Sequence, residues 1–261
     1  MSLIKVVGVD LAKLVFSIHG VDEYGKTKLR KTVKRDKLLA EVAKLPKCVI
    51  GMEACSGSHY WAREFSKLGH DVRIMASKFV IPYRQSEKND ANDAEAICEA
   101  VSRPKTRYVS IKSEEQQAVL CLHRIRQGAI KDRTARINRL RGLLSEFGII
   151  MPKGRYPAQN AISGILEDAE NGLPFLAREL LDDLWQSIKR LNEEILKYDR
   201  KLYRLANQMQ AAKRLMSIPG VGEITATAVV ATVNDAKHFA TSRAFSAWIG
   251  LVPKQYTTGG V

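Results

Sequence analysis

The N-terminal part of the chain alternates short apolar runs with segments whose apolar residues recur at helical spacing. Short apolar runs bounded by turn residues are typical of strands, and apolar residues three and four apart are typical of helices. The runs that predict strands cover residues 4–10, 14–21, 26–33, 47–53 and 71–76. The segments that predict helices cover residues 36–45, residues 59–69 and the stretch that opens at Asp90. Three hairpin-linked strands followed by strand–helix–strand crossovers predict a mixed sheet with helices on its faces.

The middle of the chain has a longer period. A helix is predicted over about residues 114–147, where Ile137, Leu140, Leu144 and Phe147 keep a spacing of three and four. A second series of apolar residues occupies positions 180, 184, 188, 191, 195, 198, 202 and 205. This rhythm is typical of a coiled-coil seam. The Gly- and Pro-rich residues 148–164 between the two series predict an irregular connection. We therefore expect a helical hairpin that packs against itself or against a partner chain.

The C-terminal part begins near Lys213. A Pro-Gly-x-Gly turn precedes an Ala-, Val- and Thr-rich segment that predicts a helix, and the chain stops in a Gly-containing stretch, which we interpret as a truncated region. The predicted fold class is α/β plus all-α. The predicted domains are a catalytic domain over residues 1–108, a helical coiled-coil region over 109–209 and the first part of a C-terminal domain over 210–261.

Charge and composition narrow the function classes. The chain has 42 basic and 28 acidic residues, a net charge of +14, and residues 101–150 alone contain 11 basic against 4 acidic residues. This excess of positive charge favours a polyanionic partner, although the charge could also serve only to keep the protein soluble. No apolar run is long enough for a membrane helix, and there is no secretory leader, so we expect a cytoplasmic protein with no membrane partner. The four cysteines lack metal-ligand spacing and are expected to be reduced.

Four carboxylates stand where strands end and a helix begins. Asp10 ends the first predicted strand, Glu53 ends the fourth, and Asp90 and Asp93 lie in one turn of the following helix. The strand order makes the first and fourth strands parallel neighbours, so Asp10 and Glu53 would lie side by side. Each acid also has a local explanation, because Asp10 could simply terminate a strand and Asp90 and Asp93 could complement a helix dipole.

Convergence of these four acids would give them a chemical role. Carboxylates brought together repel one another unless cations neutralise them, and hard oxygen ligands suit Mg²⁺ or Mn²⁺. Two such ions about 4 Å apart stabilise both the attacking and the leaving oxygen of a phosphodiester. The expected site is therefore a two-metal centre that acts on nucleic acid.

Several motifs together resemble the DEDD-type insertion-sequence transposases, whose catalytic domain is similar to the RuvC Holliday-junction resolvase, and the related Piv-type DNA invertases. The motifs are GVDLAK, GMEACSGSHYWAREF, KNDANDAEAI, IPGVGEITATAVVA and FATSRAFSAWIGLVPKQYTTGG. The resemblance implies an RNase H-like catalytic domain in which Asp10, Glu53, Asp90 and Asp93 bind metal. It also implies DNA recombination guided by a structured RNA, in a dimer or tetramer held partly by the coiled coil.

One position departs from this family pattern. The family places a nucleophilic serine before a glycine in its C-terminal domain, where this chain reads QYTTGG. Thr257 or Thr258 would have to serve instead, and the β-branch of threonine crowds nucleophilic attack. We therefore expect this truncated chain to bind metal and nucleic acid better than it recombines DNA.

Two further features are candidates for nucleic-acid contact. Residues 123–141 are strongly basic and would form either a phosphate-binding helical surface or a merely solvated one. The candidate residues are Arg124, Arg126, Lys131, Arg133, Arg136, Arg139 and Arg141. Gly220 and Gly222 resemble half of a helix-hairpin-helix element whose backbone N–H groups would approach a phosphate, or form an ordinary turn.

Two other functions remain open from the sequence. A junction-resolving nuclease would use the same acids with water as the nucleophile. A non-catalytic, basic coiled-coil protein would bind nucleic acid without needing Asp10 at all.

Overall fold

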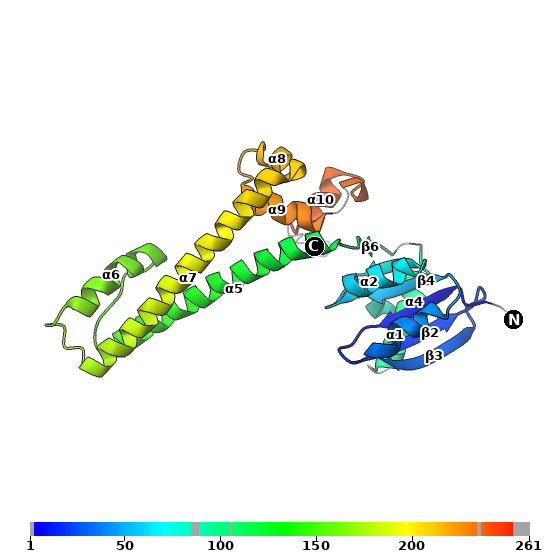
Figure 1. Cartoon of the computed structure of the whole chain (residues 1–261), viewed down its shortest axis with the longest axis horizontal. Helices are drawn as coiled ribbons and strands as arrows, with labels where there is room; N and C mark the ends of the chain where they lie inside the picture. Colours follow the sequence, from blue (N-terminus) through cyan, green and yellow to red (C-terminus); the bar gives the residue numbers. More distant parts are fainter. Residues whose placement is uncertain (1–2, 85–88, 105, 234–235, 253–261) are drawn as a thin grey trace, which may run out of the picture. The chain divides into compact units, whose positions relative to one another are not determined.

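The computed structural model describes residues 3–84, 89–104, 106–233 and 236–252, and it divides the chain into two compact units. The first unit comprises residues 1–113 together with 234–261, and the second comprises residues 114–233 (Figure 1). Each unit has its own secondary structure and is described separately. None of the helices in the described ranges is long and apolar enough to cross a bilayer.

A six-stranded mixed sheet forms the first unit, in the order β3-β2-β1-β4-β5-β6. The strands are β1 Val6–Asp10, β2 Val15–Val21, β3 Thr27–Lys34, β4 Val49–Glu53, β5 Asp71–Met75 and β6 Tyr108–Val109. β1, β2 and β3 pair antiparallel, whereas β1, β4 and β5 are parallel neighbours. The predicted mixed sheet is confirmed, and its arrangement is compatible with an RNase H-like domain. The two-residue edge strand β6 has no counterpart in the prediction.

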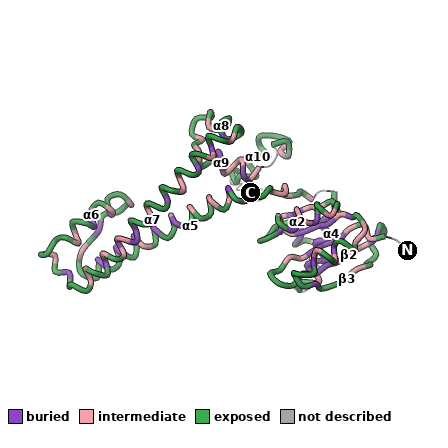
Figure 2. Tube along the Cα trace, viewed as in Figure 1, coloured by how far each residue is buried: buried purple, intermediate pink, exposed green. Residues whose placement is uncertain are grey.

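Helices cover both faces of this sheet. They are α1 Leu38–Ala43, α2 Ser58–Lys67, α3 Ser77–Val80 and α4 Asp90–Val101. The core on one face joins Val7 and Val9 of β1 to Leu38 of α1 and to Trp61 and Phe65 of α2. The other face is packed by α4, and Figure 2 shows buried residues concentrated in the strands and in α4.

Two glycines allow α4 to lie close to the sheet. A Cβ atom on Gly8 of β1 would stand 2.1 Å from the carbonyl oxygen of Ala94, and one on Gly51 of β4 would stand 2.8 Å from Cβ of Val101. Side chains at these two positions would therefore push the helix away. The contact fixes how far the first turn of α4 lies from the strand ends.

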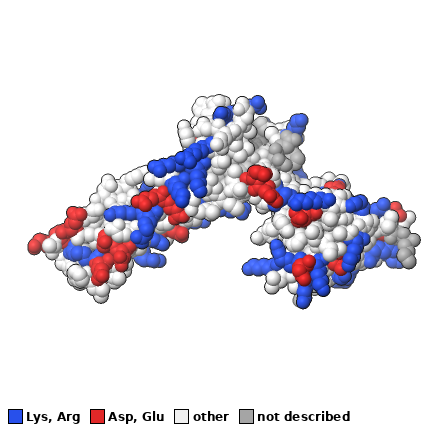
Figure 3. Space-filling model, in the orientation of Figure 1, with Lys and Arg blue, Asp and Glu red and all other residues white. Residues whose placement is uncertain are grey.

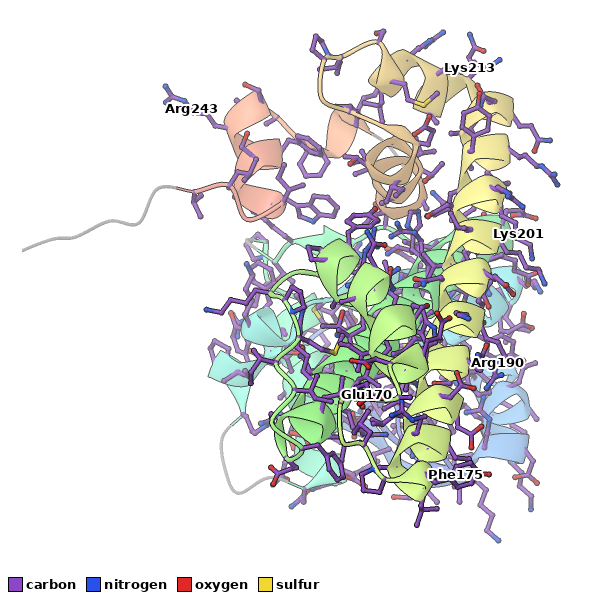
Figure 4. All side chains as sticks on the ribbon, turned by 90° about the vertical axis from the view of Figure 1, so that its left-hand side faces the viewer. Glu170, Phe175, Arg190, Lys201, Lys213 and Arg243 are labelled. Atoms are coloured by element: carbon purple, nitrogen blue, oxygen red, sulfur yellow. The ribbon has the colours of Figure 1, made fainter. Side chains whose placement is uncertain are left out.

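The second unit is helical. Its helices are α5 Glu114–Ser145, α6 Arg155–Glu167, α7 Phe175–Gln208, α8 Gln210–Met216 and α9 Glu223–Thr232. Arg126 of α5 pairs with Asp199 of α7, and the later residue Arg133 pairs with the earlier residue Asn192. α5 and α7 are therefore antiparallel, and Figure 4 follows α7 from Phe175 past Arg190 and Lys201.

The apolar seam of α7 is shifted at its start. Ile188, Leu191, Ile195 and Leu202 are buried as their spacing predicts. Leu180, in contrast, is 58% exposed. In the first turns of α7, Leu181 and Trp185 are buried instead of the predicted positions 180 and 184.

The connection between the long helices is not irregular throughout. Residues 155–167 form α6, and its Ala158 and Ile162 are buried in the same core as Leu140 and Leu144 of α5. The prediction of an irregular segment was wrong here.

The predicted third domain divides between the two units. α8 and α9 belong to the helical unit, and they form a small core with the end of α7 through Ala206, Ala212 and Ala226. A further helix, α10 Ser242–Trp248, follows the 3-10 turn Ala236–His238. Its N-cap Thr241 accepts a hydrogen bond from the backbone N–H of Ala244 at 3.2 Å.

Candidate active site

The sheet brings Asp10 and Glu53 to the same edge. Val9 of β1 stands opposite Met52 of β4 in a parallel register, so the next residues along both strands are Asp10 and Glu53. Both are the last residues of their strands and both are half-buried. The predicted neighbour relation of the two strands is confirmed.

The helix α4 presents the other two acids from its first turn. Asn89 is the N-cap, and its side chain accepts a hydrogen bond from the backbone N–H of Asn92 at 2.9 Å. Asp90 and Asp93 are therefore not needed as caps. Asp90 is exposed, whereas Asp93 is only 7% exposed. Interaction with the helix dipole does not by itself explain a buried aspartate in the first turn, because burying an isolated charge is costly in free energy.

The other three acids act electrostatically on Asp10. The pKa of Asp10 is raised to about 6, chiefly by burial and then by the negative charges of Asp93, Asp90 and Glu53, in that order of importance. The guanidinium of Arg84 acts in the opposite direction on the same pKa. The acids of β4 and α4 are thus close enough to Asp10 for their charges to disfavour its ionised form.

Two residues that the sequence analysis did not predict hold the acids. Ser77 at the start of α3 donates a hydrogen bond from Oγ to Oε1 of Glu53. Arg84 forms an ion pair with Asp93, with 2.5 Å between Nε and Oδ1. The position of Ser77 could have been predicted from the sequence, since Ser77 follows β5, the parallel neighbour of β4. The position of Arg84 could not have been predicted in this way, because it depends on how the chain turns before α4.

The acids are near one another without forming a closed ligand set. Within the described ranges, no three His, Cys, Asp or Glu side chains stand close enough together to hold a metal ion. The oxygen donors themselves suit a hard divalent cation. A cationic group already lies against Asp93, in the form of Arg84.

The basic surface predicted on α5 is in part used inside the helical unit. Arg126 donates from Nε to Oδ1 of Asp199 on α7. Arg133 is 7% exposed and donates from Nη1 to Oδ1 of Asn192 at 3.0 Å. These two arginines bond to side chains of α7, and their assignment to a phosphate-binding surface stays a prediction.

A third arginine serves the connection after α5. Arg141 donates from Nη2 to the carbonyl oxygens of Pro152 at 3.0 Å and Gly154 at 2.6 Å. The members of the predicted set that remain exposed or half-exposed are Arg124, Lys131, Arg136 and Arg139. They keep the predicted phosphate contact open on the face of α5 away from α7.

The remaining candidates lie toward the C-terminus. Gly220 has a φ of +86°, which only glycine adopts readily, and Gly222 is the N-cap of α9. A turn before a helix is thus present, as both interpretations of this motif require. Thr257 and Thr258 lie outside the described residues.

A mixed sheet with acids at two parallel strand ends and at a helix start is compatible with an RNase H-like catalytic domain, and comparison with known proteins identifies the family. Residues 7–149 match the DEDD transposase family of IS110 type, and residues 212–261 match the family described as "Transposase IS116/IS110/IS902 family".

Three relatives are similar over almost the whole chain. A "Probable family 20 transposase" of Pseudomonas aeruginosa is 44% identical, covering 97% of this chain and 75% of the relative. The transposase for insertion sequence element IS1328 of Yersinia enterocolitica is 41% identical, covering 100% and 77%. The transposase for element IS1111A of Coxiella burnetii is 41% identical, covering 99% and 71%.

The chain therefore belongs to the DEDD-type transposases of insertion sequences. Transposases as a class cut and join DNA, so DNA is the substrate class that this membership gives.

Proposed function

We propose that this protein cuts and rejoins DNA at the ends of an insertion sequence, with Asp10, Glu53, Asp90 and Asp93 binding Mg²⁺ or Mn²⁺, two ions at a time. The observation that carries the proposal is the parallel register of β1 and β4, which brings Asp10 and Glu53 to one edge of the sheet, with Asp93 buried in the first turn of α4. Acids that repel one another at the edge of a sheet form a ready cation site.

Each residue of the site has a distinct task in this proposal. Asp10 and Glu53 project from adjacent strand ends, and the Ser77 hydroxyl keeps one Glu53 oxygen oriented. Arg84 pairs with Asp93, and this ion pair would have to open for Asp93 to hold a cation. Bound divalent cations would supply stabilisation of the attacking and leaving oxygens of the phosphodiester.

The nucleophile that joins the protein to DNA is proposed to be a hydroxyl of Thr257 or Thr258. The support is the place of QYTTGG in the segment that matches the transposase family. A threonine hydroxyl needs its proton removed before it attacks, and the acidic site would have to approach it during the reaction.

A structured RNA and further copies of this chain are the proposed partners besides DNA. The net charge of +14 favours polyanions, and duplex RNA is read mainly through its shape and backbone. Association as a dimer or tetramer through α5 and α7, as a coiled coil, is supported by exposed apolar residues on α7. These are Phe175, Leu176 and Leu180. Exposed apolar side chains in a group favour a protein partner.

The test of this function is a DNA cleavage and strand-transfer assay on Asp10→Asn, with Asp36→Asn as the control. Asp36 is an exposed acid of the same unit, so the control makes the same chemical change away from the site. With Mg²⁺ and a plasmid bearing the element's ends, Asp10→Asn should lose activity by on the order of a hundredfold, the typical cost of losing electrostatic stabilisation of a transition state.

The outcomes separate the proposed function from its rivals. Unchanged strand transfer by Asp10→Asn would refute the acidic site. Cleavage without joining, and without any trapped protein–DNA adduct, would instead indicate a hydrolytic nuclease.

A further inference from the structure

A polar cavity lies beside α4, on the face of the sheet that carries the acids. Its volume is about 510 Å³, and it is lined by the open flank of α4 and by β2 with the turn after it. The lining side chains that matter here are His19, Asp22, Tyr83, Glu95 and Arg103. All of them belong to the first unit.

The floor of the cavity contains an unsatisfied histidine. His19 is 4% exposed, and its Nδ1 has no hydrogen-bond partner among the described residues. Its Nε2 has one contact, with Oγ1 of Thr27 at 3.4 Å. Burial lowers the pKa of His19, so the ring is neutral near neutral pH. A buried polar nitrogen without a partner is costly, and a ligand that bonds to it would remove that cost.

The cavity lining has more acidic than basic side chains, which favours N–H donors over a phosphate. Asp22 is occupied by the turn N–H groups of Tyr24 and Lys26, and Arg103 pairs with Glu99. Glu95 is exposed on the open flank of α4, and in the described part of the chain no ion pair engages it. Its carboxylate is therefore available as an acceptor within the cavity.

Basic and planar groups flank this acceptor. Exposed lysines and arginines occupy β3, the strand beside β2, and Figure 3 shows basic side chains gathered over β3 and α1 on the face of the sheet opposite to α4. They include Arg30 and Lys28, which also pairs with Asp22. At the other end, the guanidinium of Arg103 lies 5.7 Å from the ring centroid of Tyr83. Aromatic rings and guanidinium planes are the groups on which unstacked bases pack in proteins.

The cavity is next to the acidic site. His19 of β2 stands opposite Gly8 of β1, two residues before Asp10. Two strand residues span about 7 Å, so a nucleotide whose phosphate reached Asp10 could extend its base toward His19.

We propose that this cavity binds one unpaired nucleobase next to the strand-transfer position, with Glu95 accepting from its exocyclic amino group and His19 bonding to its ring edge. This inference rests on the proposed function, since it places the base beside the reacting phosphate. The chemistry favours cytosine, adenine or guanine over thymine or uracil, which have no amino group. RNA and DNA strands offer the same base edge, and the basic side chains of β3 would contact the adjoining phosphates.

The test measures binding of short fluorescent single strands that differ only at one central position. The full-length chain is titrated in EDTA, so no cleavage occurs, with oligonucleotides carrying cytosine, thymine or an abasic unit, in DNA and RNA arms. The variants are Glu95→Gln and, as the matched control, Glu64→Gln. Glu64 lies on α2, which covers the opposite face of the sheet.

The wild type and Glu64→Gln should bind the cytosine strand about tenfold more tightly than the abasic strand, as expected for one well-placed base contact. Glu95→Gln should lose most of that difference. The RNA and DNA arms show which strand supplies the base. Equal binding of cytosine and abasic strands by the wild type, or an unchanged difference in Glu95→Gln, would overturn the proposal.

The result is independent of strand transfer. If the protein recombines DNA but does not discriminate between bases, only the proposed base-binding cavity is refuted. If it discriminates between bases but cannot recombine DNA, only the proposed function is refuted.

Discussion

At the scale of single residues, Asp10 is a carboxylate whose ionisation is opposed first by burial and then by its acidic neighbours. Its pKa is about 6 in the folded protein and has an ordinary value of 3.8. The unfolded chain therefore gives up this proton at lower pH than the folded one. The contribution of Asp10 to stability falls as pH rises from about 4 through about 6, and it remains lowered above that range.

The first prediction follows from this sign. In EDTA at about pH 7.5, Asp10→Asn should melt at a higher temperature than the wild type, because the amide carries no charge to be repelled. Near pH 4 the two proteins should melt alike, and circular dichroism would measure both. A variant that is no more stable at neutral pH would contradict the crowding of acids described above.

The second residue-scale prediction concerns Arg84. Its ion pair with Asp93 places a cation where a divalent ion would bind. Arg84→Gln should therefore bind Mn²⁺ about three- to tenfold more tightly in calorimetric titrations, since a competing and partly buried charge is gone. Arg107→Gln, an exposed arginine of the same unit, is the control. Weaker binding by Arg84→Gln would mean that the guanidinium organises the acids instead of competing for them.

At the scale of elements, the position of α4 depends on the absence of side chains beneath it. Gly8→Ala would place a methyl group against the backbone of Ala94 and Cys98, where no flexible group can yield. We expect a loss of about 2 kcal/mol in the free energy of unfolding, in the range of overpacked cores, and a loss of strand transfer.

The matched control is Gly128→Ala in α5. A Cβ atom there meets nothing within 4 Å, so alanine should leave stability unchanged or raise it by up to about 1 kcal/mol through helix propensity. Urea denaturation of both variants would measure the difference. Equal stability of the two would show that α4 can shift without cost.

The elements that the sequence predicted are those with strong periodicity. The five principal strands and the long helix α5 follow directly from apolar spacing. The helix α6 did not, because Gly154 and Pro157 suggest a loop. Proline is compatible with a first helical turn, where its missing N–H is not needed, and Gly154 precedes the helix with a φ of +92°.

The site was predicted in part for a similar reason. Asp10 and Glu53 follow from strand order, which a sequence can indicate. The inward direction of Arg133 was also available from spacing, because it precedes Ile137 by four residues on the same helical face. Charge composition alone suggested a surface role instead. Arg84 depends on tertiary contacts that no local pattern encodes.

At the scale of the whole molecule, the charge excess should govern how nucleic acid is bound. The exposed basic residues of α5 would each release counterions if they contact phosphate. Replacing Arg124, Lys131 and Arg139 together by alanine should reduce the slope of log affinity against log salt by about three. Fluorescence anisotropy of a labelled duplex at several salt concentrations would measure it.

Arg133→Ala is the comparison for that measurement. It removes a positive charge that is buried against Asn192, so it should lower the stability of the helical unit and leave the salt slope nearly unchanged. An unchanged slope in the triple variant would place nucleic-acid binding on another surface.

The helix α4 carries two acids in its first turn, and its open flank lines the cavity that contains His19. Under the two proposals above, this single helix would connect the acids that cut DNA to the cavity that contacts a neighbouring base. Selection for a cavity that accepts more bases would then be expected to slow DNA cleavage. The range of target sites of the element and its rate of transposition would therefore evolve together.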